Sequence, residues 1–426
     1  MQKKLIVWLL PILFGWQVVD STEIPFELTA HEEYELTQTV YNQYFQTIPP
    51  NPNVFQIESI YSDVNLTQVS RQIKPNQDFS ITGVAINERK ELVYQLDNTH
   101  YILASKQLLF DDTIVTESTV EQTYWLKQGF TVLSSPISNQ AKELKTDLRA
   151  YQAITISKIA TTAIGDFAYI SDKGWISLKD LSEKDNRMEA VQVLLSSNYS
   201  KNNIGIYVKD LTTETEAGVN QDKIFYSASI AKLPILYYVQ EQLNAGQVAL
   251  NTTVKYTAES ISFNGAYKVS GSGSLSKTPD NKDYTIEELI NKTAKESDNV
   301  ASNLLSYYIA NKFDDDFFQV TTAVTGSKWD MVSRETSAQV AGKMMEALYE
   351  QNGYVIESLL STQFDNQRIS KDIPVPVAHK IGDADDVKHD VAIVYAESPF
   401  VLSIFTDKSS YNEITQIAND IYGILK

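Results

Sequence analysis

The spacing of apolar residues along the chain changes near residue 186, and this change limits the folds that the chain can adopt. Before that point, short apolar runs between turn residues predict strands at 79–84, 91–96, 130–133 and 167–170. Beyond it, helical periodicity alternates with strands, and two apolar strands near 391–395 and 400–406 precede a last amphipathic helix. We therefore expect an α+β fold over residues 187–426, with an antiparallel sheet from both chain ends flanked by helices. Small all-β barrels should precede it.

The N-terminus has the organisation of an export signal. Lys3 and Lys4 precede an apolar run over 5–19 that is short for a membrane span, which needs roughly 20 residues. Residues 1–21 thus predict a signal peptide, with an N-terminal anchor left open. The chain has no cysteine, which excludes a lipoprotein anchor and disulfides, and its net charge of -18 argues against a nucleic-acid partner. We expect an extracellular, wall-associated or membrane-associated protein.

Two segments of the strand-rich half resemble each other. In each, an aromatic residue opens a strand, Tyr101 in the first and Trp175 in the second, and a lysine and a leucine follow shortly. This pattern resembles bacterial SH3-type, GW-like modules, one over 22–120 and one over 121–186. The resemblance implies binding of cell-wall polymer or peptide by the two aromatic residues in a Gram-positive bacterium. The alternative is that both rings only fill small barrel cores.

Ser229 and Lys232 stand three residues apart at the start of a predicted helix, so their side chains share one face. A serine hydroxyl is a weak nucleophile until a base removes its proton, and a lysine with a lowered pKa can be that base. Ser227 is excluded from this role because the residue three positions on is Ile230. The spacing alone is common in exposed helices, so other motifs in the chain must show whether Ser229 and Lys232 are catalytic.

Two further motifs follow in order, Ser-Asp-Asn at 297–299 and Lys-Ile-Gly at 380–382. Together with Ser229 and Lys232, they resemble the Ser-x-x-Lys, Ser-Asp-Asn and Lys-Thr-Gly set of class A β-lactamases and penicillin-binding proteins. The resemblance covers about 187–426 and includes the Gly-Ser-Gly-Ser-Leu segment at 271–275. It implies a β-lactamase or transpeptidase-like fold.

The resemblance also implies a role for each motif residue. Ser229 would be the acylated nucleophile, Lys232 its proton partner, and Ser297 the group that passes a proton to the leaving nitrogen. Substrate binding would fall to Asn299, Lys380, Gly382 and Asp383. Asn299 would hold the substrate amide and Lys380 its carboxylate, while the N–H groups of Ser229 and Asp383 would form an oxyanion hole. The alternative for Ser297 is that it only caps a helix.

The chain departs from the family pattern in two places. Ile381 replaces the hydroxyl that helps to bind a ligand carboxylate, and Asp383 puts an acid nearby, where like charges repel. An Ω-loop Glu-x-x-Leu-Asn is also missing, because none of the glutamates between the second and third motifs has Leu-Asn after it; they are Glu335, Glu346, Glu350 and Glu357. We therefore do not expect an efficient β-lactamase.

The four histidines, His31, His100, His379 and His389, lack the spacing of metal ligands, and we expect no metal and no cofactor. His379 or His389 with Asp390 could form a Ser-His-Asp triad, although their places at strand ends favour structural roles. The sequence thus predicts an exported serine acyl-transfer hydrolase that acts on peptidoglycan peptides or a related amide through an acyl-enzyme. The alternative is a catalytically weak or inactive wall-binding pseudoenzyme.

Overall fold

The computed structural model describes residues 43–426. The predicted export segment, 1–21, lies outside the described residues. Within residues 43–426, no helix is both long enough and apolar enough to cross a bilayer. The chain forms two compact units. One comprises residues up to 119 with 132–144 and 158–175, and the other comprises 120–131, 145–157 and 176–426.

A five-stranded antiparallel sheet, with the order β3-β2-β6-β5-β4, and a two-stranded β1-β7 pair begin the described chain. The strands are β1 (Pro52–Val54), β2 (Glu58–Tyr61), β3 (Val69–Ile73), β4 (Gly83–Ile86), β5 (Leu92–Gln95), β6 (Tyr101–Leu103) and β7 (Leu109–Asp111). Side chains such as Ile60, Ile73 and Tyr94 form a small core. The strand predicted at 91–96 is confirmed, whereas the one predicted at 79–84 begins only at Gly83.

A six-stranded sheet follows, with the order β13-β8-β10-β11-β12-β9. Its strands are β8 (Ile114–Leu126), β9 (Val132–Leu133), β10 (Ala153–Thr162), β11 (Gly165–Ile170), β12 (Gly174–Ser177) and β13 (Leu181–Ser182). Trp175 lies partly buried in β12, with its ring centroid 5.1 Å from that of Tyr169, while Tyr101 belongs to β6 of the other sheet. The region is rich in strands as expected, but the SH3-type barrels are not confirmed.

Beyond residue 186 the chain forms a second five-stranded antiparallel sheet, with the order β15-β14-β22-β21-β20. Its strands are β14 (Ile204–Asp210), β15 (Glu216–Val219), β20 (Val377–Ala384), β21 (Val387–Val394) and β22 (Phe400–Asp407). Since β14 pairs directly with β22, the sheet combines strands from both ends of this region. The predicted α+β architecture is confirmed.

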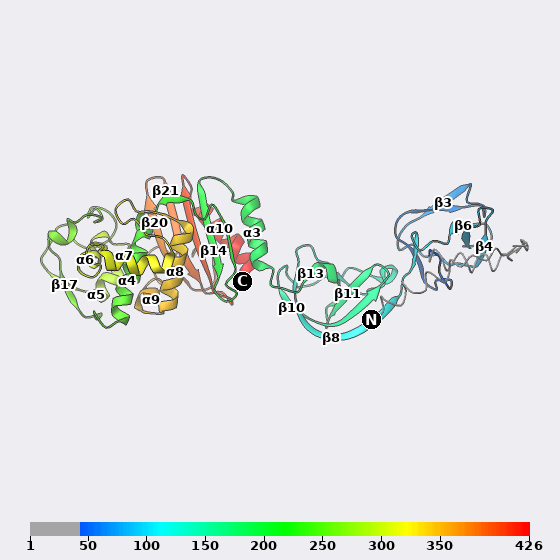
Figure 1. The fold of residues 1–426 in the computed structure, drawn as a ribbon, viewed down its shortest axis with the longest axis horizontal. Helices are drawn as coiled ribbons and strands as arrows, with labels where there is room; N and C mark the ends of the chain where they lie inside the picture. Colours follow the sequence, from blue (N-terminus) through cyan, green and yellow to red (C-terminus); the bar gives the residue numbers. More distant parts are fainter. Residues whose placement is uncertain (1–42) are drawn as a thin grey trace, which may run out of the picture. The chain divides into compact units, whose positions relative to one another are not determined.

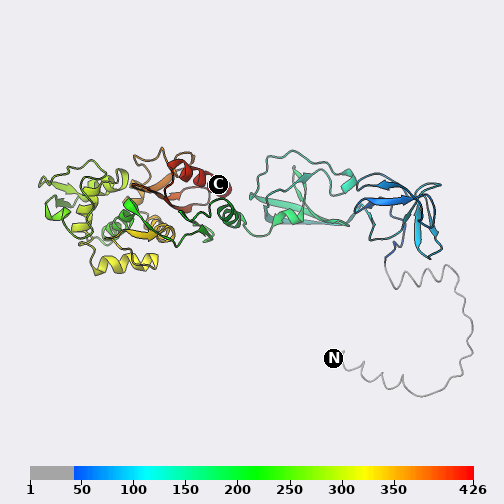
Figure 2. The same cartoon turned by 90° about the horizontal axis from the view of Figure 1, so that it is seen from above.

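Helices cover both faces of this sheet (Figures 1 and 2). α3 (Arg187–Asn198) and α10 (Tyr411–Leu425) contact each other on one face, and α8 (Ala338–Gln351) packs against the other. Successive side chains of a strand point to opposite faces, so Ile206 and Val208 of β14 join the core under α10, while Tyr207 joins the larger core under α8. The sheet therefore separates two hydrophobic cores.

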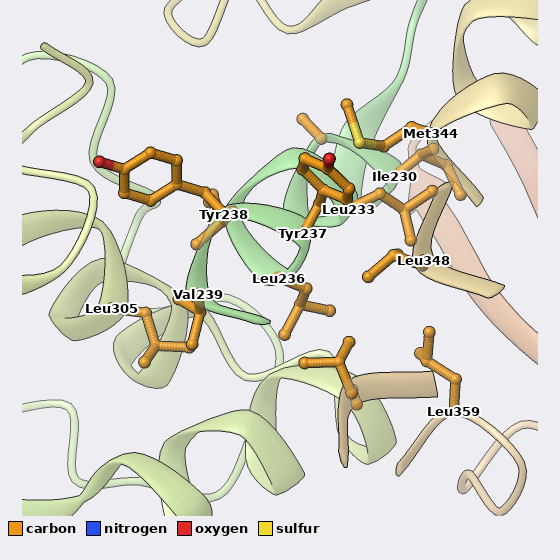
Figure 3. Packing of buried hydrophobic residues seen from close by; sticks show 14 of the residues in the cluster. Ile230, Leu233, Leu236, Tyr237, Tyr238, Val239, Leu305, Met344, Leu348 and Leu359 are labelled. Atoms are coloured by element: carbon orange, nitrogen blue, oxygen red, sulfur yellow. The ribbon is translucent and has the colours of Figure 1, made fainter. Parts of the chain in front are cut away.

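The larger core holds the elements that carry the sequence motifs. Besides α8 it contains α4 (Leu233–Asn244), α5 (Ile286–Lys295), α6 (Asn299–Tyr308), α7 (Asp315–Thr325), α9 (Tyr354–Ser358), the β16 (Ile224–Tyr226) and β19 (Glu335–Ser337) pair, and the β17 (Thr253–Lys255) and β18 (Asp283–Thr285) pair. Every residue of α4 from Leu233 to Gln240 is buried. Figure 3 shows Val239 beside Leu305 of α6, with Leu236 on another side of α4. A helix surrounded in this way gives a rigid base for the residues that precede it.

The packing of α8 on the sheet yields a test with a matched control. A Cβ added at Gly342 of α8 would lie 2.4 Å from the Tyr207 ring, whereas one at Gly423 of α10 would have no neighbour within 4 Å. Gly342→Ala should lower the free energy of unfolding by about 1–3 kcal/mol, and Gly423→Ala should raise it by about 0.5–1 kcal/mol. Urea unfolding followed by helical circular dichroism measures both. Equal effects would contradict the close approach of α8 to Tyr207.

Candidate active site

Ser229 lies in a short 3-10 helix, η4 (Ala228–Lys232), that runs directly into α4. Ala228 has a φ of 48°, a left-handed conformation that costs a residue with a Cβ on the order of 1–2 kcal/mol. The carbonyl of Arg334 holds this turn, because it accepts hydrogen bonds from both the amide and the hydroxyl of Ser227 at 2.7 Å. The Ser227 side chain is thereby structural, and the partly exposed Ser229 is the serine open to a substrate.

The amine of Lys232 is fully buried and contacts four oxygen atoms. The Ser297 carbonyl oxygen, at 2.6 Å from Nζ, and Oδ1 of Asn299, at 2.7 Å, can only accept hydrogen bonds. The hydroxyl oxygens of Ser229, at 3.0 Å, and Ser297, at 3.2 Å, can also donate. A neutral amine would donate to the first two and offer its lone pair to the Ser229 hydroxyl. This is the geometry of a general base beside its nucleophile.

The electrostatics keep Lys232 neutral. Burial lowers the pKa of Lys232 well below its usual value, and the charge of Lys380 lowers it further. Burial also lowers the pKa of Lys380, to about 7, with an opposing contribution from Asp390 and further repulsion from Arg368. Both amines contact Ser297 Oγ, that of Lys380 at 2.8 Å. Charging both at this separation is unfavourable, so a proton on Lys380 favours the neutral form of Lys232.

In the second motif, Asp298 caps a helix and Ser297 contacts two lysines. Asp298 caps α6, because its Oδ1 accepts a hydrogen bond from the Ala301 amide at 2.9 Å. Ser297 precedes the cap with a φ of 54° and is fully buried. Its hydroxyl lies between the amines of Lys232 and Lys380. Helix capping therefore belongs to Asp298, and the Ser297 hydroxyl connects the two lysines.

The glycine-rich segment at 271–275 packs directly on this motif. A Cβ at Gly271 would lie 2.2 Å from Asn299 Nδ2, and one at Gly273, whose φ is +106°, would lie 2.1 Å from Asp298. Glycine is the residue that permits both the conformation and the approach. Asn299 Nδ2 donates one proton to the Lys268 carbonyl at 2.8 Å. Because an amide nitrogen carries two protons, a second donor remains for a substrate carbonyl.

The third motif lies on β20, which contacts η4. A Cβ at Gly382 would lie 2.7 Å from the carbonyl oxygen of Ser227, so a larger residue would push the strand away from the nucleophile. Ile381, with 5% of its surface exposed, is buried at the position where the resemblance places a hydroxyl. The N–H groups of Ser229 and Asp383, predicted to form an oxyanion hole, belong to these two adjoining segments.

The Asp383 carboxylate has partners that the sequence did not reveal. It forms an ion pair with Arg368 and a hydrogen bond with the Tyr411 hydroxyl, and it lies 3.4 Å from Lys388 Nζ. Arg368 is almost fully buried, with its guanidinium 3.9 Å from the centroid of the Tyr411 ring. These contacts offset the charge of Asp383, so the expected repulsion of a substrate carboxylate is weaker than the sequence indicated.

The two histidines near the third motif form hydrogen bonds with residues other than Ser229. His379 Nδ1 lies 3.0 Å from Asp390 Oδ1, and its Nε2 lies 3.1 Å from Asp365 Oδ1. His389 Nε2 donates to the Tyr226 carbonyl at 2.8 Å. Within residues 43–426 neither ring is bonded to Ser229, so the structure does not support the Ser-His-Asp alternative. Among the same residues, no cluster of three or more His, Cys, Asp or Glu side chains could hold a metal ion.

Sequence reasoning missed Tyr267 and Arg334. The centroid of the Tyr267 ring lies 4.6 Å from Lys232 Nζ and 4.0 Å from the guanidinium carbon of Arg334. Arg334 also donates to the carbonyl oxygens of Gly265 and Ala266 at 2.8 and 3.1 Å. These contacts connect residues distant in sequence and belong to no motif. The only local signal in the sequence is the place of Arg334 directly before Glu335, where β19 begins.

The buried histidines predict opposite dependences of stability on pH. Burial would lower the pKa of His379, but Asp390 and Asp365 raise it to about 9, whereas burial lowers the pKa of His389 to about 4. His379 therefore contributes stability below pH about 6.5, and the contribution falls by up to about 3 kcal/mol as the pH rises to about 9. His389 destabilises the fold as the pH falls from about 6.5 to 4.

Urea unfolding of the full chain across this pH range, followed by helical circular dichroism, measures both slopes. Between pH about 7 and 9 the buried amine of Lys380, whose pKa is lowered to about 7, contributes a slope of the opposite sign. His379→Gln should therefore make the free energy of unfolding rise more steeply with pH in this window than in wild type, and leave the acid side unchanged. A slope between pH about 7 and 9 that is the same in this variant as in wild type would contradict the charged state of His379.

Comparisons with known proteins are consistent with this site. The family model described as "Beta-lactamase enzyme family" matches residues 186–425. A domain of unknown function, DUF5776, matches 44–109, and no curated protein matches the chain.

Similar solved structures include a beta-lactamase from Sphaerobacter thermophilus, with 21% identity and a TM-score of 0.45 over 56% of this chain and 97% of that one. A beta-lactamase from Chitinophaga pinensis has 16% identity and a TM-score of 0.46 over 56% and 98%. A structure of PBP-A has 18% identity and a TM-score of 0.45 over 56% and 94%. Because the family model matches more than half of its length, the chain belongs to the beta-lactamase enzyme family.

Proposed function

We propose that the chain is an active serine acyl-transfer hydrolase that acts on cell-wall peptides or a related amide through an ester at Ser229. The observation that carries the proposal is the Lys232 amine, buried and 3.0 Å from Ser229 Oγ. A protein that only binds a ligand has no need to bury an amine of lowered pKa against a partly exposed serine.

The residues support a balanced two-step reaction. Ser229 Oγ attacks the substrate carbonyl and gives its proton to Lys232 Nζ. The Ser297 hydroxyl, in contact with both lysine amines, relays a proton to the nitrogen that leaves. The N–H groups of Ser229 and Asp383 would stabilise the oxyanion, a contribution of about 3 kcal/mol for each such donor. Water then hydrolyses the ester and regenerates Ser229.

The substrate assignment rests on the sequence. The export-type segment at 1–21 would place the protein outside the cell, where peptidoglycan peptides supply the amide bonds. Tyr101 and Trp175 remain the candidates for wall binding by the strand-rich part of the chain.

The second candidate function is a wall-binding protein with little or no catalytic turnover. Ile381 favours it, because an apolar side chain there removes a hydrogen bond to a substrate carboxylate. The connection between α7 and β19 favours it too. The connection contains no glutamate, and the first one after it, Glu335, is exposed on β19 opposite Tyr226. A site without a carboxylate that primes water should release its acyl group slowly.

Labelling with a fluorophosphonate separates the two functions. Wild type should gain one adduct by intact mass and Ser229→Ala none, because of the two serines beside Lys232 only Ser229 is partly exposed, while Ser297 is fully buried. Ser227→Ala should keep the adduct, which makes it the matched control. Mapping of the label to Ser227 or Ser297, or a natively folded wild type that takes no label, would refute the catalytic proposal.

β-Lactams test recognition of the carboxylate. Wild type should react slowly with a fluorescent penicillin and hydrolyse nitrocefin negligibly, because Ile381 offers no hydroxyl and no Ω-loop glutamate primes water. Ile381→Thr should speed acylation by about tenfold, the value of one hydrogen bond to a charged group, while deacylation stays slow. Ile381→Val is the control for size.

Asp383 should remain unchanged in this test, since its removal would leave the buried Arg368 without its carboxylate. Rapid nitrocefin turnover by wild type would mean that another residue activates water.

A further inference from the structure

A cavity of about 490 Å³ is lined by residues that have no part in the reaction described above. Its volume lies in the range of small-molecule sites. It is bounded by the segment around Asn264 and by the connection between α7 and β19. Gly265, next to Asn264, accepts a hydrogen bond from Arg334 at 2.8 Å. The Arg334 guanidinium packs on the Tyr267 ring, which also contacts Lys232, so a chain of contacts connects the cavity lining with the surroundings of Lys232.

The floor of the cavity is apolar. Phe313 and Met331 are buried, and Phe318 is partly buried on the same lining. The ring of Phe313 also underlies Gly265, where a Cβ would lie 3.0 Å from it. An aromatic floor of this kind favours the alkyl or aryl part of a ligand.

The rim of the cavity is cationic. The Nζ of Lys328 lies 4.0 Å from the centroid of the Phe318 ring, and that of Lys312 lies 5.3 Å from the centroid of Tyr307. Within residues 43–426 neither ammonium makes a direct ion-pair contact with a carboxylate, and the charge of Lys328 helps to lower the pKa of Asp330. The one acid on the lining, Asp330, accepts hydrogen bonds from two backbone amides at 2.8 and 2.9 Å, so its charge is partly satisfied by its own turn.

The backbone fixes part of this rim. Asn311, Lys312 and Phe313 have φ values of 41°, 61° and 69°, a left-handed run that residues with a Cβ rarely adopt. The Lys312 amide donates to the Ser306 carbonyl at 2.8 Å, which helps to hold this run. The tertiary structure therefore imposes the position of Lys312 at the edge of the cavity.

We propose that this cavity binds the carboxylate-bearing arm of the acyl donor, with the alkyl part of the arm on Phe313, Phe318 and Met331 and the carboxylate between Lys312 and Lys328. The assignment rests on the proposed function and specifies its substrate, an anionic acyl donor. Two cations above an apolar floor select a ligand that is both negatively charged and apolar. A neutral arm would leave Lys312 without a counter-charge and Lys328 with Asp330 alone, and a cationic arm would be repelled.

The first test compares two fluorophosphonates that differ only in the end of one alkyl arm, a carboxylate or a methyl group. The rate of Ser229 labelling in the full-length protein should be about tenfold higher with the carboxylate, since each exposed ion contact contributes a factor of about two to five. In Lys312→Gln/Lys328→Gln the two rates should become equal. Lys282→Gln removes a lysine that is 75% exposed outside the cavity and should keep the preference.

The second test needs no chemistry at Ser229. Calorimetric titration of Ser229→Ala with N-adipoyl, N-heptanoyl and N-(6-aminohexanoyl) glycine amide compares anionic, neutral and cationic arms of similar length. The adipoyl compound should bind about tenfold more tightly than the heptanoyl one, and added salt or the double lysine substitution should abolish the difference.

Equal binding of the three compounds, or a preference that survives the double substitution, would overturn the proposed site. If no fluorophosphonate labels wild type but the titration shows the preference, the catalytic proposal fails and the cavity assignment stands as an anion-binding site.

Discussion

The burial of the Lys232 amine among four oxygen atoms is the interaction on which the rest of the site depends. Burial of an ammonium costs several kcal/mol, so burial and the charge of Lys380 favour the neutral amine of Lys232, while the charge of Asp298 opposes this. That state requires acceptors held at fixed positions. The Asp298 cap, the glycines of 271–275 and the apolar helix α4 supply this rigidity, and each is a packing feature with a chemical consequence.

The contrast with His379 shows how the fold selects a charge state. Both groups are removed from water, but His379 lies between Asp390 and Asp365, which raise its pKa to about 9. Lys232 has Lys380 nearby, and its pKa falls. The difference follows from the partner that the tertiary structure brings close. A carboxylate stabilises the cation that burial disfavours, while a second cation adds to the cost of burial. Arg368 follows the same rule as His379: it is a buried cation stabilised by a carboxylate, that of Asp383 at the end of β20.

The connection between α7 and β19 links the segments that carry Ser229 and Tyr267. The single residue Arg334 binds the turn before Ser229 through its carbonyl, and the Tyr267 segment through its guanidinium. It therefore links the nucleophile to the segment that faces Lys232. No glutamate in this connection is buried beside the serine, and the space next to it is a cavity with an apolar floor and two lysines. In the proposed reaction, Ser229 and Lys232 would serve acylation, while this connection supplies no glutamate to activate water for deacylation.

The sequence by itself determined the α+β class, the strand-rich first half, and the three motifs in order, because residue spacing and periodicity are local properties of the chain. It also proposed Ser229, Lys232 and Ser297 as candidate site residues from three short motifs, and the fold brings their side chains together. It could not show that Asp298 rather than Ser297 caps α6, or that Arg368 and Tyr411 bind Asp383. It gave no sign of Tyr267 beside Lys232 or of the cavity. These features arise where segments separated by tens of residues meet, and only the tertiary structure decides which charges and rings are neighbours.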